Sequence, residues 1–147
     1  MENILSDEYF MEIALKEAQK AFDDDEVPIG AVIVHENKII GKGYNQTEKL
    51  KDITAHAEMI AITAASGYIG SKYLEECTMY VTLEPCVMCM GALKASRITK
   101  VVFGASEPKT GFSVFLPSQF ANKINIVGNI KQQECALLMQ DFFKNKR

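Results

Sequence analysis

Apolar and polar residues follow one another along this chain in two rhythms, one typical of helices and one typical of strands. Helical spacing, with apolar residues three and four positions apart, predicts four longer helices. They are expected at residues 6–22, 55–65, 85–96 and 132–143. Thr54 is the expected N-cap of the second helix, and Gly67 and Gly70 are expected to break its pattern.

Short runs rich in Val, Ile and Thr predict five strands between these helices. They are expected at residues 31–34, 38–41, 78–83, 100–104 and 124–127. Glu36 and Asn37 separate the first two strands and are expected to form a hairpin turn. Residues 105–123 have no clear period, and only a short helical turn near 114–121 is predicted there.

The order of the predicted elements indicates the fold class. Two strands joined by a turn pair antiparallel, whereas strands joined through helices are usually parallel neighbours. The chain is therefore predicted to be an α/β protein, a three-layer α/β/α sandwich with a mixed five-stranded sheet. Its 147 residues are expected to form a single domain, residues 1–147.

Composition narrows the compartment and the class of protein. Hydrophobic residues make up 48% of the chain, which is enough for a core, and no apolar run has the length of a membrane span. The first residues lack the basic start and apolar stretch of a signal peptide, so a cytoplasmic location is predicted. Four cysteines do not suggest a disulfide scaffold, and a close pair of cysteines in the cytosol is more often metal-binding or catalytic.

The charge pattern leaves two interpretations open. The net charge of −3 argues against strong nonspecific binding to nucleic acid, which depends on Lys and Arg neutralising phosphates. The charges are nevertheless clustered. Residues 23–26 are all acidic, whereas Lys94, Arg97 and Lys100 form one basic stretch and residues 144–147 are mostly basic. These clusters are either solvated surface with a frayed tail or, for the basic ones, a local RNA-facing patch.

The chemically informative residues lie at the starts of the second and third predicted helices. Cys86 and Cys89 stand one turn apart in a Cys-x-x-Cys segment, so both sulfurs can bind one ion. A helix N-terminus also favours the thiolate form of a cysteine. His56 is expected to open the preceding helix, and zinc accepts two thiolates and one imidazole.

Three protein ligands leave one tetrahedral position of zinc open, which is typical of catalytic rather than structural sites. Water bound at such a position becomes acidic near neutral pH. Glu58, two residues after His56, is predicted to be the catalytic residue, because it can reach this water and carry its proton without binding the metal.

Two other interpretations of the cysteine pair compete with this one. A redox dithiol would account for Cys86 and Cys89 but not for the His-Ala-Glu segment upstream. A structural Cys2His2 site would recruit His35, the other histidine of the chain, as a fourth ligand. His35 lies beside the predicted hairpin turn and is more typical of a surface residue.

His-Ala-Glu, followed 30 residues after its histidine by Cys-x-x-Cys with a preceding proline, matches the signature of the zinc deaminases of nucleobases. The chain resembles, over nearly its whole length, the bacterial tRNA-specific adenosine deaminases of the cytidine deaminase-like superfamily. The segments that carry this resemblance are residues 26–32, 54–58, 80–89, 101–105, 109–111 and 141–143.

The resemblance implies hydrolytic deamination of adenosine to inosine at the wobble position of a tRNA anticodon. It implies one zinc per subunit and a homodimer with its sites near the subunit interface, with His56, Cys86 and Cys89 as ligands and Glu58 as acid and base. Asn45 matches the base-contacting asparagine of the family. The further expected substrate contacts are Val27, Leu83 and Pro85.

The chain departs from the family pattern after Gly111, where residues 112–116 are bulkier than the usual small residues. Two other functions fit part of the sequence. A deaminase of free guanine, cytosine or a nucleoside would use the same zinc chemistry and fits the acidic pI. A non-enzymatic, zinc-stabilised RNA-binding module is the second, but such a module has no need of Glu58.

Overall fold

The computed structural model describes residues 5–146 and contains twelve helices and strands over that range. Residues 1–4 and Arg147 lie outside the described residues. The former belong to the N-terminal segment from which no signal peptide was predicted, and the latter to the basic C-terminal run. The longer helices are α1 (Asp7–Asp23), α3 (Ala57–Ile69), α4 (Val87–Ala95) and α6 (Gln132–Lys144). The shorter ones are α2 (Thr47–Leu50), α5 (Phe112–Phe115) and a 3-10 helix, η1 (Ser118–Ala121).

The five strands form one mixed sheet in the order β2-β1-β3-β4-β5. They are β1 (Gly30–His35), β2 (Lys38–Tyr44), β3 (Thr78–Leu83), β4 (Lys100–Ala105) and β5 (Asn125–Val127). β1 pairs antiparallel with both β2 and β3, whereas β4 pairs parallel with β3 and β5. The prediction of an α/β fold with a mixed five-stranded sheet is confirmed.

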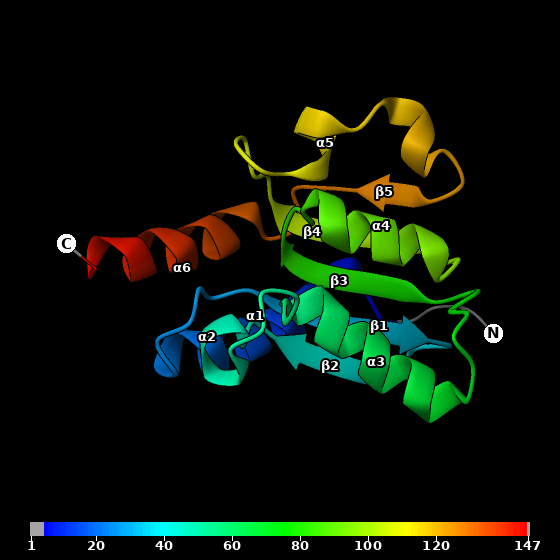
Figure 1. Cartoon of the computed structure of the whole chain (residues 1–147), viewed down its shortest axis with the longest axis horizontal. Coiled ribbons are helices and arrows are strands. Elements are labelled where there is room, and N and C mark those ends of the chain that lie inside the picture. The colour runs from blue at the N-terminus through cyan, green and yellow to red at the C-terminus, as the bar shows by residue number, and fades with distance from the viewer. Residues whose placement is uncertain (1–4, 147) are drawn as a thin grey trace.

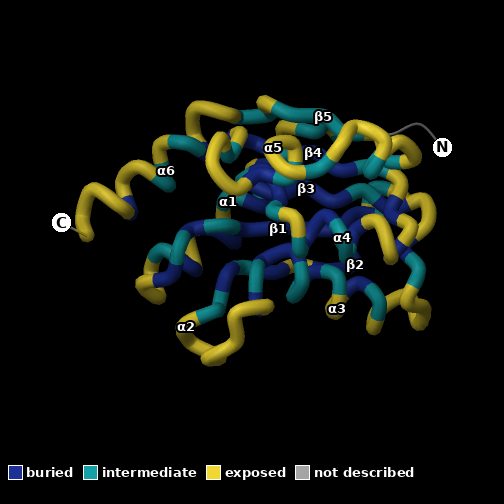
Figure 2. The backbone as a smooth tube through the Cα atoms, turned by 45° about the horizontal axis from the view of Figure 1, so that its top comes forward, coloured by how far each residue is buried: buried dark blue, intermediate teal, exposed yellow. Residues whose placement is uncertain are grey.

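Helices cover both faces of this sheet (Figure 1). α3 and α4 lie together on one face, α3 over β1 and β2 and α4 beside it in front of β3 and β4. α1 and α6 pack on the other face. The strands at the centre are buried and most connecting loops are exposed (Figure 2). No helix within residues 5–146 is long and apolar enough to cross a membrane.

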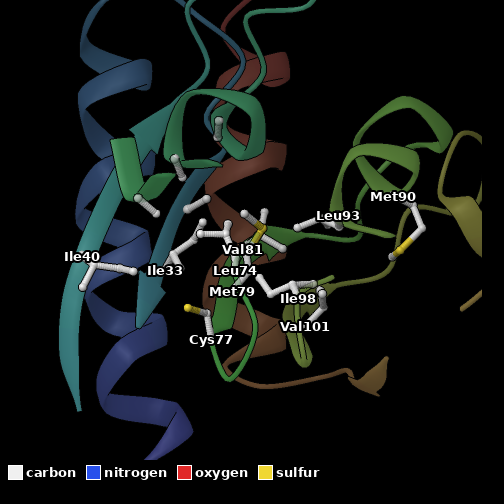
Figure 3. Packing of buried hydrophobic residues seen from close by; sticks show 14 residues of the cluster. Ile33, Ile40, Leu74, Cys77, Met79, Val81, Met90, Leu93, Ile98 and Val101 are labelled. Atoms are coloured by element: carbon white, nitrogen blue, oxygen red, sulfur yellow. The ribbon is translucent and has the colours of Figure 1, made fainter. Parts of the chain in front are cut away.

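Each face of the sheet has its own apolar core. The core under α3 and α4 brings together Ile33, Met79 and Val101 of the sheet with Leu93 of α4 (Figure 3). The core under α1 and α6 is built around Phe10, Val32 and Tyr80. Alternate residues of one strand, such as Val32 and Ile33, thus enter opposite cores, as the two-residue period of a strand requires.

α3 approaches the sheet closely because β2 offers glycines beneath it. A Cβ atom at Gly43 would lie 2.4 Å from the carbonyl oxygen of Ala57, and one at Gly41 would lie 2.6 Å from that of Ala61. Small residues on both sides therefore let the two backbones meet without a side chain between them. This contact holds the first turn of α3 against the end of β2.

The ends of α3 differ from those predicted. His56 rather than Thr54 is its N-cap, since the Thr54 N–H and hydroxyl both donate to the Asp52 carboxylate, at 2.8 and 2.7 Å, in a turn before the helix. The helix also continues through Gly67 and ends at Gly70, whose φ of 77° is left-handed. The hairpin turn at Glu36 and Asn37 is confirmed, with φ values of 50° and 64°.

Candidate metal centre and active site

The N-termini of α3 and α4 lie side by side on one face of the sheet, and the predicted metal ligands stand at these two helix starts. His56 is the N-cap of α3, Cys86 is the N-cap of α4, and Cys89 lies in the first turn of α4. One donor atom from each of the three residues lies within 4.8 Å of the other two. Among residues 5–146, no other group of three His, Cys, Asp or Glu side chains meets in this way.

The distances between these donor atoms suit a small tetrahedral ion. Nδ1 of His56 lies 3.7 Å from the Sγ of Cys86 and 3.4 Å from the Sγ of Cys89. Zinc bonds of about 2.3 Å to sulfur and about 2.0 Å to nitrogen, set at tetrahedral angles, separate an S and an N ligand by about 3.5 Å. The donor set and its spacing therefore fit zinc without a change of backbone.

The two cysteines hold their protons very differently. A hydrogen bond from Cys89, with a smaller contribution from His56, lowers the pKa of Cys86 to about 4, so that its thiolate is present at neutral pH. The hydrogen bond to Cys86 and burial raise the pKa of Cys89 well above its usual range. The thiolate that binds a metal is therefore favoured at Cys86, whereas Cys89 has to lose its proton to bind one.

Glu58 is a buried carboxyl group beside these ligands. It lies in the first turn of α3 and is 4% exposed, and its Oε1 atom is buried without a hydrogen-bond partner among the described residues. Burial raises the pKa of Glu58 to about 7. An unpaired buried polar oxygen is costly in a folded protein, so this atom needs a partner that the chain itself does not supply, such as water or a substrate.

His35 lies away from this site. It ends β1 at the edge of the sheet where Val34 pairs with Thr78, whereas Cys86 follows the opposite end of β3. The His35 ring instead faces the carbonyl oxygen of Glu76 at 3.4 Å. The structural Cys2His2 interpretation, which requires His35 as fourth ligand, is therefore wrong.

The predicted substrate contacts lie close to the two helix starts. Val27, Asn45 and Pro85 are on loops, and Leu83 is the last residue of β3. Asn45 is 6% exposed, and its Nδ2 donates to the Val27 carbonyl at 3.2 Å while its Oδ1 accepts the Thr47 N–H at 3.3 Å. These bonds join the segment before β1 to the one after β2. Leu83 is half-buried and Pro85 buried, directly before Cys86.

Glu26, which the charge pattern grouped with an exposed acidic run, is only 2% exposed. Its carboxylate accepts the backbone N–H groups of Glu48 and Lys49, at 3.1 and 2.7 Å. It thereby anchors the short helix α2, which begins two residues after Asn45 and is not among the helices predicted from the sequence. The adjacent turn residues were a weak signal for α2, because four helical residues are too few to show a period.

Glu84 plays a similar part on the other side of the site. It is 5% exposed and accepts from the N–H of Glu107 at 3.1 Å and from the N–H and hydroxyl of Ser113 at 3.0 and 2.6 Å. A Cβ atom at Gly111 would come within 2.5 Å of the Glu84 carboxylate, so only glycine fits there. Phe112 N–H also donates to the Pro85 carbonyl at 2.9 Å.

The Glu84 contacts therefore attach the 107–113 loop to the segment that carries Cys86. In the sequence Glu84 is expected only to help wall the pocket together with its neighbours. Its hold on the loop could not be predicted, because its partners lie more than 20 positions away in the chain.

Comparison with known proteins agrees with this geometry. Residues 5–105 match the family described as the cytidine and deoxycytidylate deaminase zinc-binding region. The chain is 47% identical to a tRNA-specific adenosine deaminase of Aquifex aeolicus, with 95% of each chain covered. It is also 47% identical to one of Buchnera aphidicola, with 96% of each chain covered.

A solved structure from a study of A-to-I editing by tRNA:A34 deaminases at the wobble position superposes on this fold. Its TM-score is 0.83 at 38% sequence identity, and the match covers 88% of this chain and 98% of that one. The zinc-binding prediction is supported by the family description and by the His, Cys, Cys cluster. The chain therefore belongs to the cytidine and deoxycytidylate deaminase family and, within it, to the tRNA-specific adenosine deaminases.

Proposed function

We propose that this protein hydrolyses adenosine to inosine and ammonia at the wobble position of a tRNA anticodon. The observation that carries the proposal is the buried Glu58 carboxylate oxygen, unpartnered among the described residues, beside the His56, Cys86 and Cys89 cluster. This arrangement supports a hydrolytic enzyme rather than a binding module. The identity of 47% to tRNA-specific adenosine deaminases narrows the substrate to adenosine in tRNA.

The three clustered residues would hold one zinc ion per subunit. When bound, zinc supplies an open coordination position at which water becomes acidic near neutral pH. The lowered pKa of Cys86 favours its thiolate at that pH, whereas Cys89 has to lose its proton to bind the ion.

Glu58 moves the protons of the reaction. Its Oε1 accepts a proton from the attacking water, and the oxygen of that water forms a bond to C6 of adenine. The same carboxyl group then delivers this proton to the ring nitrogen N1. It takes the second proton from the new hydroxyl group on C6 and passes it to the amino group, which leaves as ammonia while the C6–N bond breaks and the C6 carbonyl forms. A group that accepts and returns a proton works best with a pKa close to the working pH, which fits the pKa of about 7 that burial gives Glu58.

Asn45, Val27, Leu83 and Pro85 are proposed to surround the base. Glu26 fixes the loop that carries Asn45, so the amide is held in one orientation. An anticodon base is already partly unstacked, and its extrusion into a pocket therefore costs less than the flipping of a base from a duplex. A tRNA substrate also fits the cytoplasmic location predicted from the sequence.

We also propose that the protein is a homodimer joined through the outer face of α3. Helix α3 exposes apolar side chains away from the sheet, and Met59, Ile60 and Ala64 line a largely apolar hollow of about 440 Å³ together with Leu50. Leu50 is 53% exposed and Ile53 is 81% exposed. A second copy of the chain would cover this surface, and α3 would bring both active sites close to the interface. Sedimentation of the purified protein tests this proposal.

The decisive experiment for the activity is inosine formation in an anticodon stem-loop RNA, run beside free guanine, cytidine and adenosine. The proposal expects inosine in the RNA at the wobble position and little turnover of free guanine. Deamination of guanine alone would favour the free-base deaminase instead. RNA binding without ammonia release from any of these substrates would favour the non-enzymatic RNA-binding module.

A further inference from the structure

A hollow of about 480 Å³ lies near the end of α4 that is remote from Cys86. Three cationic side chains surround it: Lys94 from the last turn of α4, Arg97 after that helix, and Lys123 from the segment before β5. All three residues are exposed. The remaining lining residues are Ile98, Phe120, Asn122 and Ile124. Residues from two separate parts of the chain thus form one basic hollow, named here the α4 basic hollow.

None of the ion pairs among residues 5–146 neutralises these three cations. Two of them lie over aromatic rings instead. The Nζ of Lys94 is 4.3 Å from the centre of the Phe120 ring, and the Arg97 guanidinium is 4.0 Å from that of Tyr73. Cation–π contacts orient a cation without cancelling its charge. The hollow therefore keeps its positive charge on a chain whose net charge is −3.

Two of the other basic residues noted in the sequence have carboxylate partners instead. Lys100, part of the same basic stretch, turns to Asp7 and pairs with it at 3.5 Å. Lys146 of the C-terminal run pairs with Asp25. Folding thus leaves Lys94 and Arg97 of the first basic stretch without a carboxylate partner and brings Lys123 beside them.

We infer that the α4 basic hollow binds phosphate groups of the substrate RNA outside the nucleotide that is deaminated. Unpaired cations with aromatic and apolar surface between them are what RNA-binding surfaces use for a flexible nucleic acid backbone. The hollow is also rigidly connected to the active site, because α4 carries Cys89 in its first turn and Lys94 in its last. The helical rise between these two residues is about 8 Å, a length that two or three nucleotide steps span.

This inference rests on the proposed function for the identity of the ligand. According to this inference the adenine base binds in the pocket at Glu58, and the α4 basic hollow supplies part of the salt-dependent affinity for the RNA. Loss of the hollow should therefore weaken RNA binding without slowing the reaction of RNA that is already bound. A catalytic defect would show the opposite pattern.

The test compares two triple variants of the zinc-loaded protein. One carries Lys94→Ala, Arg97→Ala and Lys123→Ala. The matched control carries Lys16→Ala, Lys42→Ala and Lys144→Ala, which removes the same charge from exposed lysines elsewhere on the surface. The affinity for an anticodon stem-loop RNA is measured against salt concentration, and KM and kcat for inosine formation are measured at one salt concentration.

In a plot of the logarithm of the RNA association constant against the logarithm of the salt concentration, the slope of the hollow variant should be less steep than that of the wild type by about 2. The reason is that each lost phosphate contact reduces the steepness by about 0.7–0.9. Its KM should rise about tenfold near physiological salt while kcat stays unchanged. The control should keep the slope of the wild type. An unchanged slope in the hollow variant, or an equal change in both variants, overturns the inference.

Lys123→Ala alone guards against a folding defect, because Lys123 makes no ion pair or ring contact among the described residues. It should lower the slope by about 0.7, and Lys123→Arg should restore it. The proposed function fails separately. If the wild type binds the RNA through the hollow but forms no inosine, the activity is wrong and the binding site stands. If it forms inosine and the variants bind normally, only the binding site is wrong.

Discussion

Glu58 and Cys86 are neighbours whose protonation is moved in opposite directions by their surroundings. Cys86 receives a hydrogen bond from Cys89, which favours its charged form and lowers its pKa to about 4. Glu58 has no hydrogen-bond donor on its Oε1 atom among residues 5–146, and burial raises its pKa to about 7. The difference suits a division of labour in which a thiolate binds a metal while a carboxyl group exchanges protons.

Glu58→Gln is predicted to reduce inosine formation by about 10²–10⁴-fold, because an amide has the shape of the carboxyl group but cannot carry the proton. Zinc should stay bound, since Glu58 is not a proposed ligand. Activity and zinc content measured on the same preparation check this. Cys86→Ala is the contrasting variant and should lose both zinc and activity. Near-normal turnover in Glu58→Gln would remove the residue from the mechanism.

The raised pKa of Glu58 also predicts how the stability of the zinc-free protein depends on pH. The folded state holds the Glu58 proton up to about pH 7, whereas the unfolded chain loses it near its ordinary value of 4.5. Folding stability is therefore lost as the pH rises from about 4.5 to about 7, by about 3 kcal/mol.

Glu58→Gln should abolish this loss. The variant should match the wild type near pH 4.5 and exceed it at pH 8 in urea unfolding of the zinc-free proteins. Parallel stability curves over this pH range would contradict the prediction.

At the scale of elements, two buried carboxylates attach the loops that border the site. Glu26 holds α2 and the segment after Asn45, and Glu84 holds the 107–113 loop against the segment before Cys86. In both cases a carboxylate suits the position because every partner is a donor. The bulky segment at residues 112–116, where the chain departs from its family, begins within the loop that Glu84 holds.

Glu84→Gln is predicted to loosen this loop. The amide would direct an N–H group at a backbone N–H, leaving a buried donor unsatisfied at a cost of about 1–3 kcal/mol in the free energy of unfolding. KM for the RNA should rise more than kcat falls, and zinc should stay bound.

Ser113→Ala, which removes a single hydroxyl donor to the same carboxylate, should show the same effect more weakly. Kinetics on the stem-loop RNA with zinc analysis check both variants. An unchanged KM in Glu84→Gln would show that the attachment of the 107–113 loop by Glu84 does not affect substrate binding.

At the scale of the whole molecule, the sandwich leaves its two outer faces unequal. The outer side of α3 is apolar around Leu50 and Ala64, whereas α6 on the other face alternates exposed polar residues with single apolar ones such as Leu137. An apolar helix side next to an active site is a surface that association would bury. This asymmetry is the reason for placing the dimer interface at α3.

The wild type is predicted to sediment as a dimer of its 16.4 kDa chain, and the double variant Leu50→Glu and Ala64→Glu as a monomer. Both substituted positions are exposed, so the fold should be retained. Leu137→Glu places one carboxylate on an exposed apolar position of the opposite face and should stay dimeric. A monomeric wild type, or a double variant that still dimerises, would contradict the proposed interface.

The sequence by itself determined the fold class and the chemistry of the proposed centre. Hydrophobic periodicity, turn residues and the Cys86 to Cys89 spacing are all local signals. Each involves only a few neighbouring positions, and one helical turn spans the two cysteines. For that reason the long helices, the five strands and their order along the chain could be predicted from the residues, and the family resemblance added the nature of the substrate.

Only the tertiary structure decided which distant residues meet. It separated His35 from the cysteines, and it buried Glu26 although the neighbouring acidic residues are exposed. It gave Glu84 its loop, and it neutralised Lys100 while joining Lys123 to Lys94 and Arg97. The physical reason is the same in each case. The state of a charged side chain depends on its water and its partners, and both are set by segments far away in the chain.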